Sequence, residues 1–543
     1  MVFARRSTTL LAAIIASCAM VLSLTACTSD NKTVVDGQTT VTSNSAGGVA
    51  VFTPSDGITL NQQMPLNKWA KLMPDLTKAL VDAGFKKGDI NHTTSDSLDK
   101  QSRAIQDFVV DHLSNNTTDD SGIAIAPDNM TLLVAPVVEA DASTRQYGDY
   151  VSQNLSTNDV TDEGATSDGE SSEDDSSKDD SSNTESDSTA SDEQAQAVDR
   201  LVSSLKLAKE SGMHVVLLGN SIEGYKPDAF VKFSDAQTIG KLQAEKMVSK
   251  LKLDKASKDN PKYIEVLLPY TAMDEKGNAN DSTFAQEAFR GIWQVLGSYY
   301  QKGVVESPSG TLDGKSTEND WQAVAYDAAK EGSTAKVLDK RLAKTDGQST
   351  LTRIDGIITM NDYIASEVVK ELDDLGYTGS AADINPQITI SGIVGNITGK
   401  KDLSRDAVPD PIKSPENDNA NDSSSSDDDA DEDTSASDKD RDSQWPLVTG
   451  YGAYVSNIPS IVNGKQWMTG MEDRQTIATD IAQACAKLNK DEALNSMPSI
   501  RNSEVGGVKK IPTISEPLLA VSASNLKSAL IDPGYISLAD AGL

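Results

Sequence analysis

Short apolar runs alternate with longer stretches in which apolar residues recur at helical spacing, from Gly48 onward. The short runs predict strands buried on both faces of a parallel sheet, and the longer stretches predict amphipathic helices that cover the sheet. The predicted strands are 49–52, 131–135, 214–218, 263–268, 356–359, 388–391 and 446–449. The predicted helices are 66–84, 97–113, 195–211, 282–302, 320–344 and 361–375. A chain of 543 residues is too long for one hydrophobic core, so the pattern predicts an α/β protein of two domains.

The first residues have the layout of an export signal. Residues 1–6 are cationic, residues 10–24 are apolar with many small side chains, and Cys27 follows Leu24-Thr25-Ala26. A cationic start, an apolar stretch and small residues before a cleavage point are typical of secretory signals. An uncleaved membrane anchor is the alternative, but residues 10–24 fall short of the roughly 20 apolar residues that span a bilayer.

The same residues resemble the bacterial lipoprotein signal, in which a cysteine after Leu-Thr-Ala becomes the lipid-bearing first residue of the mature protein. This resemblance implies a signal peptide at 1–26, lipidation of Cys27 and an exported protein anchored at the extracytoplasmic face of a bacterial membrane. Residues 27–47 are rich in Thr, Ser, Asn and Gly and predict a flexible tether between the lipid and the fold.

The net charge of −33 is concentrated in two runs. Residues 159–193 carry a net charge of −13 and residues 416–442 one of −10, which leaves −10 for the rest of the chain. Both runs are nearly free of apolar residues, so we expect disordered surface insertions at about 153–194 and 400–443. Calcium binding is a weaker alternative because neither run has the ligand spacing of an EF-hand. The acidity also argues against nucleic acid as a partner.

Few residues are suited to catalysis or to metal binding. After Cys27, Cys485 is the only cysteine, and its helical surroundings predict a small core residue. The three histidines, His92, His112 and His214, do not have metal-ligand spacing, and the chain has no G-x-S-x-G nucleophile motif. We therefore expect no enzyme, no metal site and no cofactor. A tethered hydrolase is a weak alternative.

Seven segments follow one another in the order of a known family. They are Gly48–Pro54, Trp69 before Gly84-Phe85, Gln101 with Ile105, Phe233–Ala244, Asn361-Asp362, Ser460–Trp467, and the tail from Ile511-Pro512 to Gly534-Tyr535. Together they resemble the type I periplasmic binding proteins, most closely the xylose and multiple-monosaccharide branch, which serves as the lipoprotein component of sugar ABC transporters. A DNA-binding repressor shares this fold, but it would need a helix-turn-helix where this chain has an export signal.

The resemblance implies two doubly wound parallel-sheet lobes, joined by three hinge crossovers, with the ligand in the cleft between them. One lobe would comprise residues 48–234 plus 471–512, and the other residues 235–470 plus 513–543. The implied function is capture of a carbohydrate by a monomeric receptor that presents its closed form to the permease subunits of an ABC importer.

The resemblance also implies a set of ligand-binding residues. Trp69 and Trp321 would stack on the sugar, although each could instead be a core anchor. Asn361 and Asp362 would bind sugar hydroxyls, although such a pair also suits a helix N-cap. The full set of candidates is Trp69, Asn220, Asp235, Gln286, Trp321, Asn361, Asp362, Tyr451 and Glu472.

Several positions depart from the family pattern. Gly219-Asn220 stands where the family usually has Asp-Arg, and Gly452 where it usually has an Asp. Gln286 replaces a frequent Arg, and Glu472 replaces a Gln or Lys. Either the cleft binds a larger or less polar ligand, with Tyr451 or Tyr454 in the space of the missing charged side chains, or it has lost high-affinity sugar binding. The second possibility favours a surface sensory or interaction lipoprotein that reuses the scaffold.

Overall fold

The structure is a computed structural model of the whole chain, which forms two compact units, Met1–Asn44 and Ser45–Leu543. The residues that it describes are 34–35, 38–39, 46–55, 65–115, 125–138, 144–157, 185–271, 282–328, 330–343, 351–382 and 444–543. The predicted signal peptide, Cys27, the strand at 388–391 and the acidic insertion at 400–443 all lie outside the described residues.

In the first unit, two short strands pair within the segment predicted as a tether. Strand β1 (Val34–Val35) runs antiparallel to β2 (Gln38–Thr39). The composition of this segment predicted flexibility and gave no sign of this pairing.

The second unit contains two large sheets. The first has seven strands in the order β17-β18-β9-β7-β5-β3-β4, with β17 antiparallel to β18 and the others parallel. Their bounds are β3 (Gly48–Pro54), β4 (Ile90–Ser95), β5 (Met130–Val134), β7 (His214–Leu218), β9 (Ala229–Lys232), β17 (Ile500–Val505) and β18 (Val508–Ser515). Its helices are α1 (Trp69–Asp82), α2 (Leu98–Asn115), α3 (Glu185–Glu210) and α12 (Arg474–Leu488).

The second sheet has six strands in the order β12-β10-β14-β15-β16-β19, with β19 antiparallel to β16. Their bounds are β10 (Lys262–Val266), β12 (Val305–Glu306), β14 (Gly356–Ile358), β15 (Leu447–Tyr451), β16 (Met468–Met471) and β19 (Leu519–Ser522). Its helices are α4 (Ala236–Lys250), α5 (Thr283–Gln301), α6 (Trp321–Val324), α7 (Ser333–Arg341), α8 (Asp362–Leu375) and α11 (Ile458–Val462). Two small parallel pairs join β6 (Asn154–Leu155) to β8 (Ser221–Ile222) and β11 (Leu268–Tyr270) to β13 (Ala325–Asp327).

Single-turn 3₁₀ helices and one π-helix complete the described structure. The 3₁₀ helices are η1 (Lys87–Asp89), η2 (Pro127–Asn129), η3 (Arg145–Tyr147), η4 (Leu253–Lys255), η5 (Val455–Asn457) and η6 (Leu494–Ser496), and the π-helix is η7 (Lys527–Ile531).

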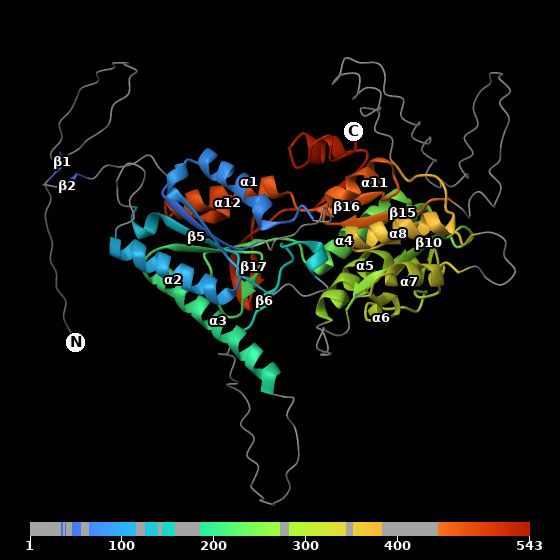
Figure 1. Cartoon of the computed structure of the whole chain (residues 1–543), viewed down its shortest axis with the longest axis horizontal. Coiled ribbons are helices and arrows are strands. Elements are labelled where there is room, and N and C mark those ends of the chain that lie inside the picture. Colours follow the sequence, from blue (N-terminus) through green and yellow to red (C-terminus); the bar gives the residue numbers. More distant parts are fainter. Residues whose placement is uncertain are drawn as a thin grey trace, which may run out of the picture. The chain divides into compact units, whose positions relative to one another are not determined.

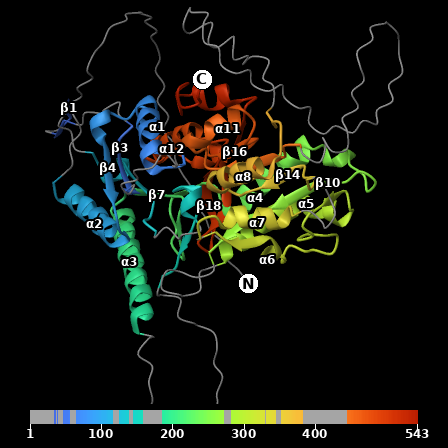
Figure 2. The same ribbon diagram turned by 45° about the vertical axis from the view of Figure 1, so that its right-hand side comes forward.

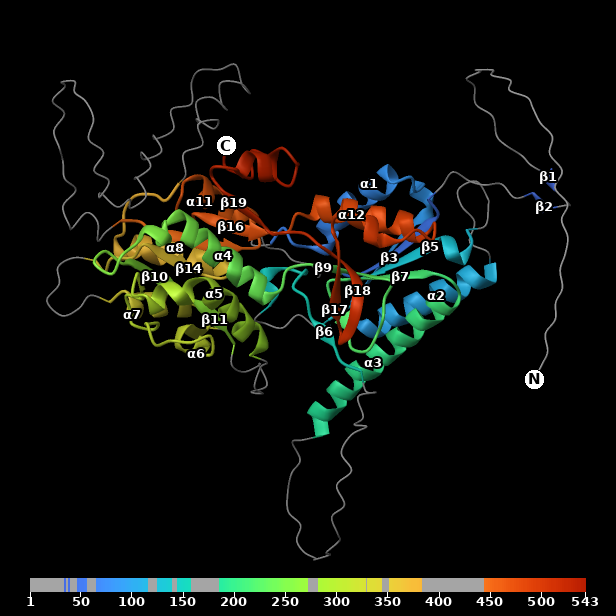
Figure 3. The ribbon, with the colours of Figure 1, turned by 180° about the vertical axis from the view of Figure 1, so that it is seen from behind.

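Helices cover both faces of each sheet (Figure 1). Helices α2 and α3 lie side by side against the first sheet in every view, including those of Figure 2 and Figure 3. Helices α1 and α12 pack together on its opposite face. On the second sheet, α4 and α5 lie together on one face, and α7 and α8 on the other.

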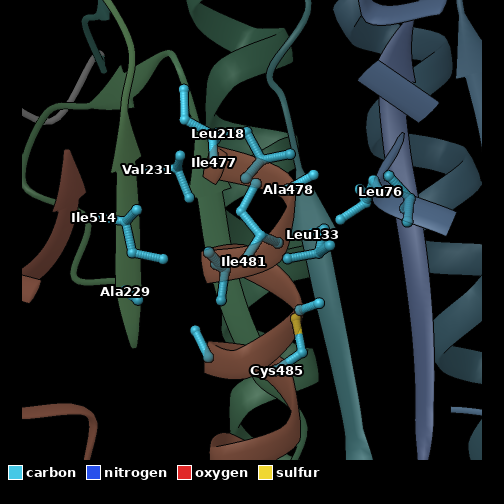
Figure 4. Packing of buried hydrophobic residues seen from close by; sticks show 14 of the residues in the cluster. Leu76, Leu133, Leu218, Ala229, Val231, Ile477, Ala478, Ile481, Cys485 and Ile514 are labelled. Carbon is cyan, nitrogen blue, oxygen red and sulfur yellow. The ribbon is translucent and has the colours of Figure 1, made fainter. Parts of the chain in front are cut away.

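The apolar core of the first lobe shows why these helices pack on the sheet. Leu76 of α1 and Ile481 of α12 meet Leu133 of β5 in one buried cluster (Figure 4). Each such side chain contributes about 1.5–3 kcal/mol when it is removed from water. Cys485 is fully buried in the same cluster, as the sequence predicted for a small core residue.

Both sheets have the same parallel strand order when their strands are numbered along each lobe. The five central strands, β4-β3-β5-β7-β9 and β12-β10-β14-β15-β16, each run in the order 2-1-3-4-5. This is the doubly wound order in which ligands bind at the carboxyl ends of the strands, beside the point where the order reverses. The predicted fold class, two doubly wound parallel-sheet lobes, is confirmed by this topology.

Between its described elements, the chain passes from one sheet to the other three times. It crosses after β9 into α4, after β16 into α12, and after β18 into β19. Thr513, Ile514 and Ser515 of β18 pair with β9. Strand β18 therefore stays in the first sheet up to Ser515, three residues beyond residue 512, where the first lobe was expected to end.

One predicted element is wrong within the described residues. The single helix predicted at 320–344 is interrupted by β13, which pairs with β11, and Gly332 precedes α7 with a φ of 71°. At the two ends of the insertion predicted at about 153–194, the structure describes β6 and the start of α3 at Glu185. Apolar residues that lie C-terminal to the acidic run anchor α3 to the sheet, and its helical backbone continues back into that run.

Candidate functional site

Trp69, the first residue of α1, is only 2% exposed. Its ring packs edge-on against Tyr150 and Phe233, with ring centroids 5.0 and 5.6 Å apart. In this structure Trp69 therefore takes the core position that the sequence left open as an alternative to sugar stacking. Trp321 lies in the second lobe, half-buried and edge-on to Tyr270 at 5.2 Å, in a different cluster.

The two glycines that depart from the expected pattern both have a positive φ. Gly219 has a φ of 71°, and a Cβ added there would be in ordinary van der Waals contact, 3.5 Å from the Trp69 ring. A Cβ added to Gly452, whose φ is 113°, would lie 3.0 Å from the Tyr454 ring and 3.3 Å from Pro65. The backbone conformation therefore disfavours an aspartate at both positions, and at Gly452 a Cβ would also crowd the Tyr454 ring.

Asn361 and Asp362 start α8 and are both fully buried. The Asn361 Oδ1 accepts the Ile364 N–H at 2.9 Å, which is the N-cap bond, while its Nδ2 donates to the Gln146 Oε1 at 3.2 Å. Asn361 therefore caps its helix and also binds a residue from outside its own lobe.

Asp362 accepts hydrogen bonds only from its own lobe among the described partners. Its carboxylate receives the Gln466 amide at 2.7 Å, the Thr469 hydroxyl at 2.8 Å and the Tyr454 N–H at 2.9 Å. Burial raises the pKa of Asp362 to about 6 against the opposing effect of these bonds. Its oxygens are engaged in holding β16 and the β15–α11 turn, so it acts as an internal acceptor in this structure.

Ser234, Tyr451 and Glu472 form what we call the hinge cluster, because Ser234 lies in the first crossover and Glu472 in the second. The Glu472 Oε1 accepts the Ser234 N–H at 2.6 Å and lies 3.4 Å from the Tyr451 hydroxyl, which in turn is 2.5 Å from the Ser234 hydroxyl. All three residues are buried. Burial raises the pKa of Glu472 to about 7, so its carboxyl is protonated in part of the molecules at neutral pH.

The remaining candidates bond to nearby backbone or to their own helix. Asn220 is 3% exposed, donates to the Pro136 carbonyl at 2.9 Å and accepts the Gln153 N–H at 3.0 Å. Asp235 caps α4 through Thr238 and pairs with Lys232 at 2.8 Å. Gln286 donates to the Ser282 hydroxyl at 2.7 Å.

The element that the sequence reasoning missed is residues 144–155, which we call the interlobe segment. It follows β5 of the first lobe, yet Tyr147 and Val151 belong to the buried cluster of the second lobe. The Tyr147 ring lies 4.6 Å from Phe284 and 6.3 Å from Tyr451, centroid to centroid. The local sequence holds no signal for these contacts, because the partners of Tyr147 are distant in the sequence.

The interlobe segment is also bonded to the first lobe. The Asp149 carboxylate pairs with Lys68 at 2.6 Å and accepts the Trp69 N–H at 3.1 Å. The Tyr150 hydroxyl donates to the Lys68 carbonyl, and the Ser152 N–H donates to the Ser234 carbonyl at 3.2 Å. The segment thus touches four of the candidates, Trp69, Asn220, Asn361 and Tyr451, directly.

A second link between the lobes precedes α1. Leu66 is buried in a cluster of the second lobe, and its N–H donates to the Gly452 carbonyl at 2.8 Å. Asn67 accepts the Asp149 N–H through its carbonyl at 2.8 Å, so this link also supports the interlobe segment.

Within the described part of the chain, no cluster of three or more His, Cys, Asp and Glu side chains is arranged to hold a metal ion. Among the described helices, none combines the length and the apolar character required to cross a bilayer.

Several solved structures are similar to this chain. A solute-binding protein of an ABC transporter from Clostridium phytofermentans, with bound β-D-glucose, is 17% identical over 91% of this chain and 99% of that one, with a TM-score of 0.45. A carbohydrate transporter solute-binding protein from Chloroflexus aurantiacus, in complex with D-glucose, is 17% identical over 92% and 98%, with a TM-score of 0.43. A periplasmic solute-binding protein from Actinobacillus succinogenes, with bound D-allose, is 10% identical over 89% and 99%, with a TM-score of 0.38. No protein-family model and no curated protein matches the sequence. The strand order of the two sheets, rather than these likenesses, establishes the fold.

Proposed function

We propose that this protein is an extracytoplasmic solute-binding receptor that captures a carbohydrate between its two lobes for an ABC importer. The observation that carries the proposal is the pair of 2-1-3-4-5 sheets joined by three crossovers. In sheets of this order the carboxyl ends of the strands form the ligand-binding edge. Ser234, Asn361 and Tyr451, which follow or end such strands in the two lobes, are linked through the hinge cluster and the interlobe segment.

The side chains near this interface are suited to a sugar. A planar amide such as that of Asn361 both donates and accepts hydrogen bonds, as vicinal hydroxyls require. An aromatic ring such as that of Phe284 offers a flat face to the C–H groups of a pyranose. We assign no catalytic step to these residues. The proposed function is binding of the solute, followed by a change in the arrangement of the lobes.

The proposed mechanism places the hinge at the crossovers. Glu472, Ser234 and Tyr451 tie two crossovers together with short hydrogen bonds, so rotation of the lobes has to occur around this cluster. A solute that contacts both lobes would favour their closed arrangement, which a permease can distinguish from the open one.

We further propose that Cys27 carries a lipid anchor, which would keep the receptor beside its permease as a monomer. Replacement of Cys27 by Ser is expected to release the protein from the membrane fraction into the medium. Metabolic labelling with a radioactive fatty acid would check the modification, and label on the Ser variant would contradict it.

The sugar function is tested by thermal unfolding of the full chain with D-xylose, D-glucose, L-arabinose and maltose. A ligand at 100 times its Kd adds about 2.7 kcal/mol to the stability of the folded state. A rise in the unfolding temperature with at least one sugar supports the proposal. The absence of any rise, both in the wild type and in Tyr147→Ala, which lacks the ring that packs on Phe284, would contradict it.

The second candidate function is a surface sensory or interaction lipoprotein with altered or lost sugar affinity. The observation that favours it is that Trp69, Asn220 and Asn361 are buried and bonded to the chain itself. Under this alternative the two lobes form a fixed scaffold, and no sugar changes the stability of the protein in any variant.

A further inference from the structure

The interlobe segment satisfies the partners that a solute between the lobes would need. Gln146 accepts from the Asn361 amide and its carbonyl accepts from the Tyr454 hydroxyl at 2.7 Å. Tyr147 is 1% exposed and packs on Phe284. One amide side chain and one aromatic ring, the two groups suited to a sugar site, are thus both supplied from within the chain.

The segment is held from the first lobe while it reaches into the second. Toward the first lobe it uses Asp149, Tyr150 and Gln153, which bind Lys68, Trp69 and Asn220. Toward the second lobe it uses Gln146, Tyr147 and Val151. Residues that alternate between the two lobes in this way connect them without any solute.

A glycine in the middle of the segment allows its backbone to lie close to the first lobe. Gly148 has a φ of 94°, and a Cβ there would lie 2.5 Å from the Asn67 carbonyl oxygen. The turn at Gly148 therefore lets the backbone approach the first lobe closely while the neighbouring Tyr147 points into the second. Strands β6 and β8 fix the other end of the segment in the first lobe.

We propose that the interlobe segment, residues 144–155, is an internal occupant of the solute site that holds the two lobes together, and that a solute binds only by displacing Gln146 and Tyr147. The identity of the site as a sugar site rests on the proposed function, whereas the connection of the lobes by the segment does not. Solute can bind only to molecules in which the segment has left the site. The apparent Kd therefore equals the intrinsic Kd divided by the fraction of such molecules. A segment that is released in one molecule in a hundred raises the apparent Kd about 100-fold.

The test compares Tyr147→Ala with two controls in the full chain. Tyr147→Phe keeps the ring and should behave as the wild type. Tyr377→Ala removes another buried tyrosine of the second lobe, which packs in a separate cluster, and so controls for a general loss of stability. Two readouts are used, namely hydrogen–deuterium exchange of backbone amides and the Kd for D-xylose and D-glucose.

The exchange readout does not depend on any sugar. In Tyr147→Ala, but not in either control, we expect at least about tenfold faster exchange in the segment and at its contacts, residues 65–68 and 452–454. Unchanged exchange at 65–68 and 452–454 would overturn the proposal, because the lobes would then be held together without the segment.

The affinity readout separates the two proposals. A Kd for either sugar that is at least about tenfold lower in Tyr147→Ala than in the wild type supports both. An equal Kd, with the segment still protected in saturating sugar, overturns the internal occupant and leaves the sugar function standing. Faster exchange without sugar binding in any variant supports the internal occupant and overturns the sugar function.

Discussion

The core of the first lobe and the interface between the lobes are both buried, but they are built from different groups. In the core, aliphatic side chains such as Leu76, Leu133 and Ile481 pack on one another without polar partners (Figure 4). At the interface, the hydroxyls of Ser234 and Tyr451 and the carboxyl of Glu472 are buried and bonded to one another. Close apolar packing makes each lobe rigid. The stability of the polar network depends instead on every one of its hydrogen bonds and on the protonation state of Glu472.

The largest effect is expected in the core. Replacing Ile481 by Ala removes a fully buried side chain, and the lost burial together with the cavity should cost about 2–5 kcal/mol. The free energy of unfolding in urea would show the loss. Val81→Ala on α1 is the matched control, because Val81 is 44% exposed and its truncation should change little. A similar loss in both variants would contradict the description of the core.

Removal of the carboxyl from the hinge cluster should have a smaller effect. In Glu472→Ala the buried Ser234 N–H loses its acceptor, which should cost about 1–3 kcal/mol. Glu472→Gln keeps an acceptor oxygen and should retain most of the stability. Equal losses in the two variants, measured by urea unfolding, would show that this hydrogen bond is not what stabilises the crossovers.

The pH dependence of stability should distinguish the interface from the core. The folded-state pKa of Glu472 is raised to about 7, so the folded protein retains a proton that the unfolded chain releases near the usual pKa of about 4.5. The stability that this group contributes is therefore present below that lower value and is lost as the pH rises through 7. The groups around its carboxyl are Ser234, Tyr451 and the nearby Asp235, whose negative charge raises the pKa further.

The measurement is the difference in unfolding free energy between the wild type and Glu472→Gln at pH 5 and at pH 7.5. Because Gln does not titrate, the wild type should lose about 1–3 kcal/mol relative to the variant over this range. Ile481→Ala should show the same pH dependence as the wild type. A wild type that gains stability relative to Glu472→Gln as the pH rises would contradict the sign of the shift.

The smallest effect is expected at the ion pair between Lys68 and Asp149, whose side chains are both 20% exposed. Lys68→Ala should destabilise the folded protein by about 0.2–1 kcal/mol, as is usual for pairs that water still reaches. The pair formed by Lys78 and Asp82 on α1 is much more exposed, and Lys78→Ala should leave the unfolding midpoint unchanged. A larger loss from Lys78→Ala than from Lys68→Ala would contradict the role of Asp149 in fixing the interlobe segment.

The comparison also explains what the sequence could predict. Strands such as 214–218 were predicted correctly because continuous apolar runs are local signals of burial on both faces. Asn361 was predicted as an N-cap or a ligand, and its dual bonding shows why the residue type could not decide between them. Tyr147 was missed because its burial depends on partners such as Phe284 and Tyr451, which are distant in the sequence. No periodicity within residues 144–155 indicates contact with a second lobe.

The most direct test of the account is a titration of D-xylose and D-glucose into the wild type, Tyr147→Ala and Tyr377→Ala under identical conditions. The account predicts that Tyr147→Ala binds at least one of the two sugars at least about tenfold more tightly than the wild type, while Tyr377→Ala binds like the wild type. Equal affinities in all three proteins would contradict the claim that the chain itself occupies the site between its lobes.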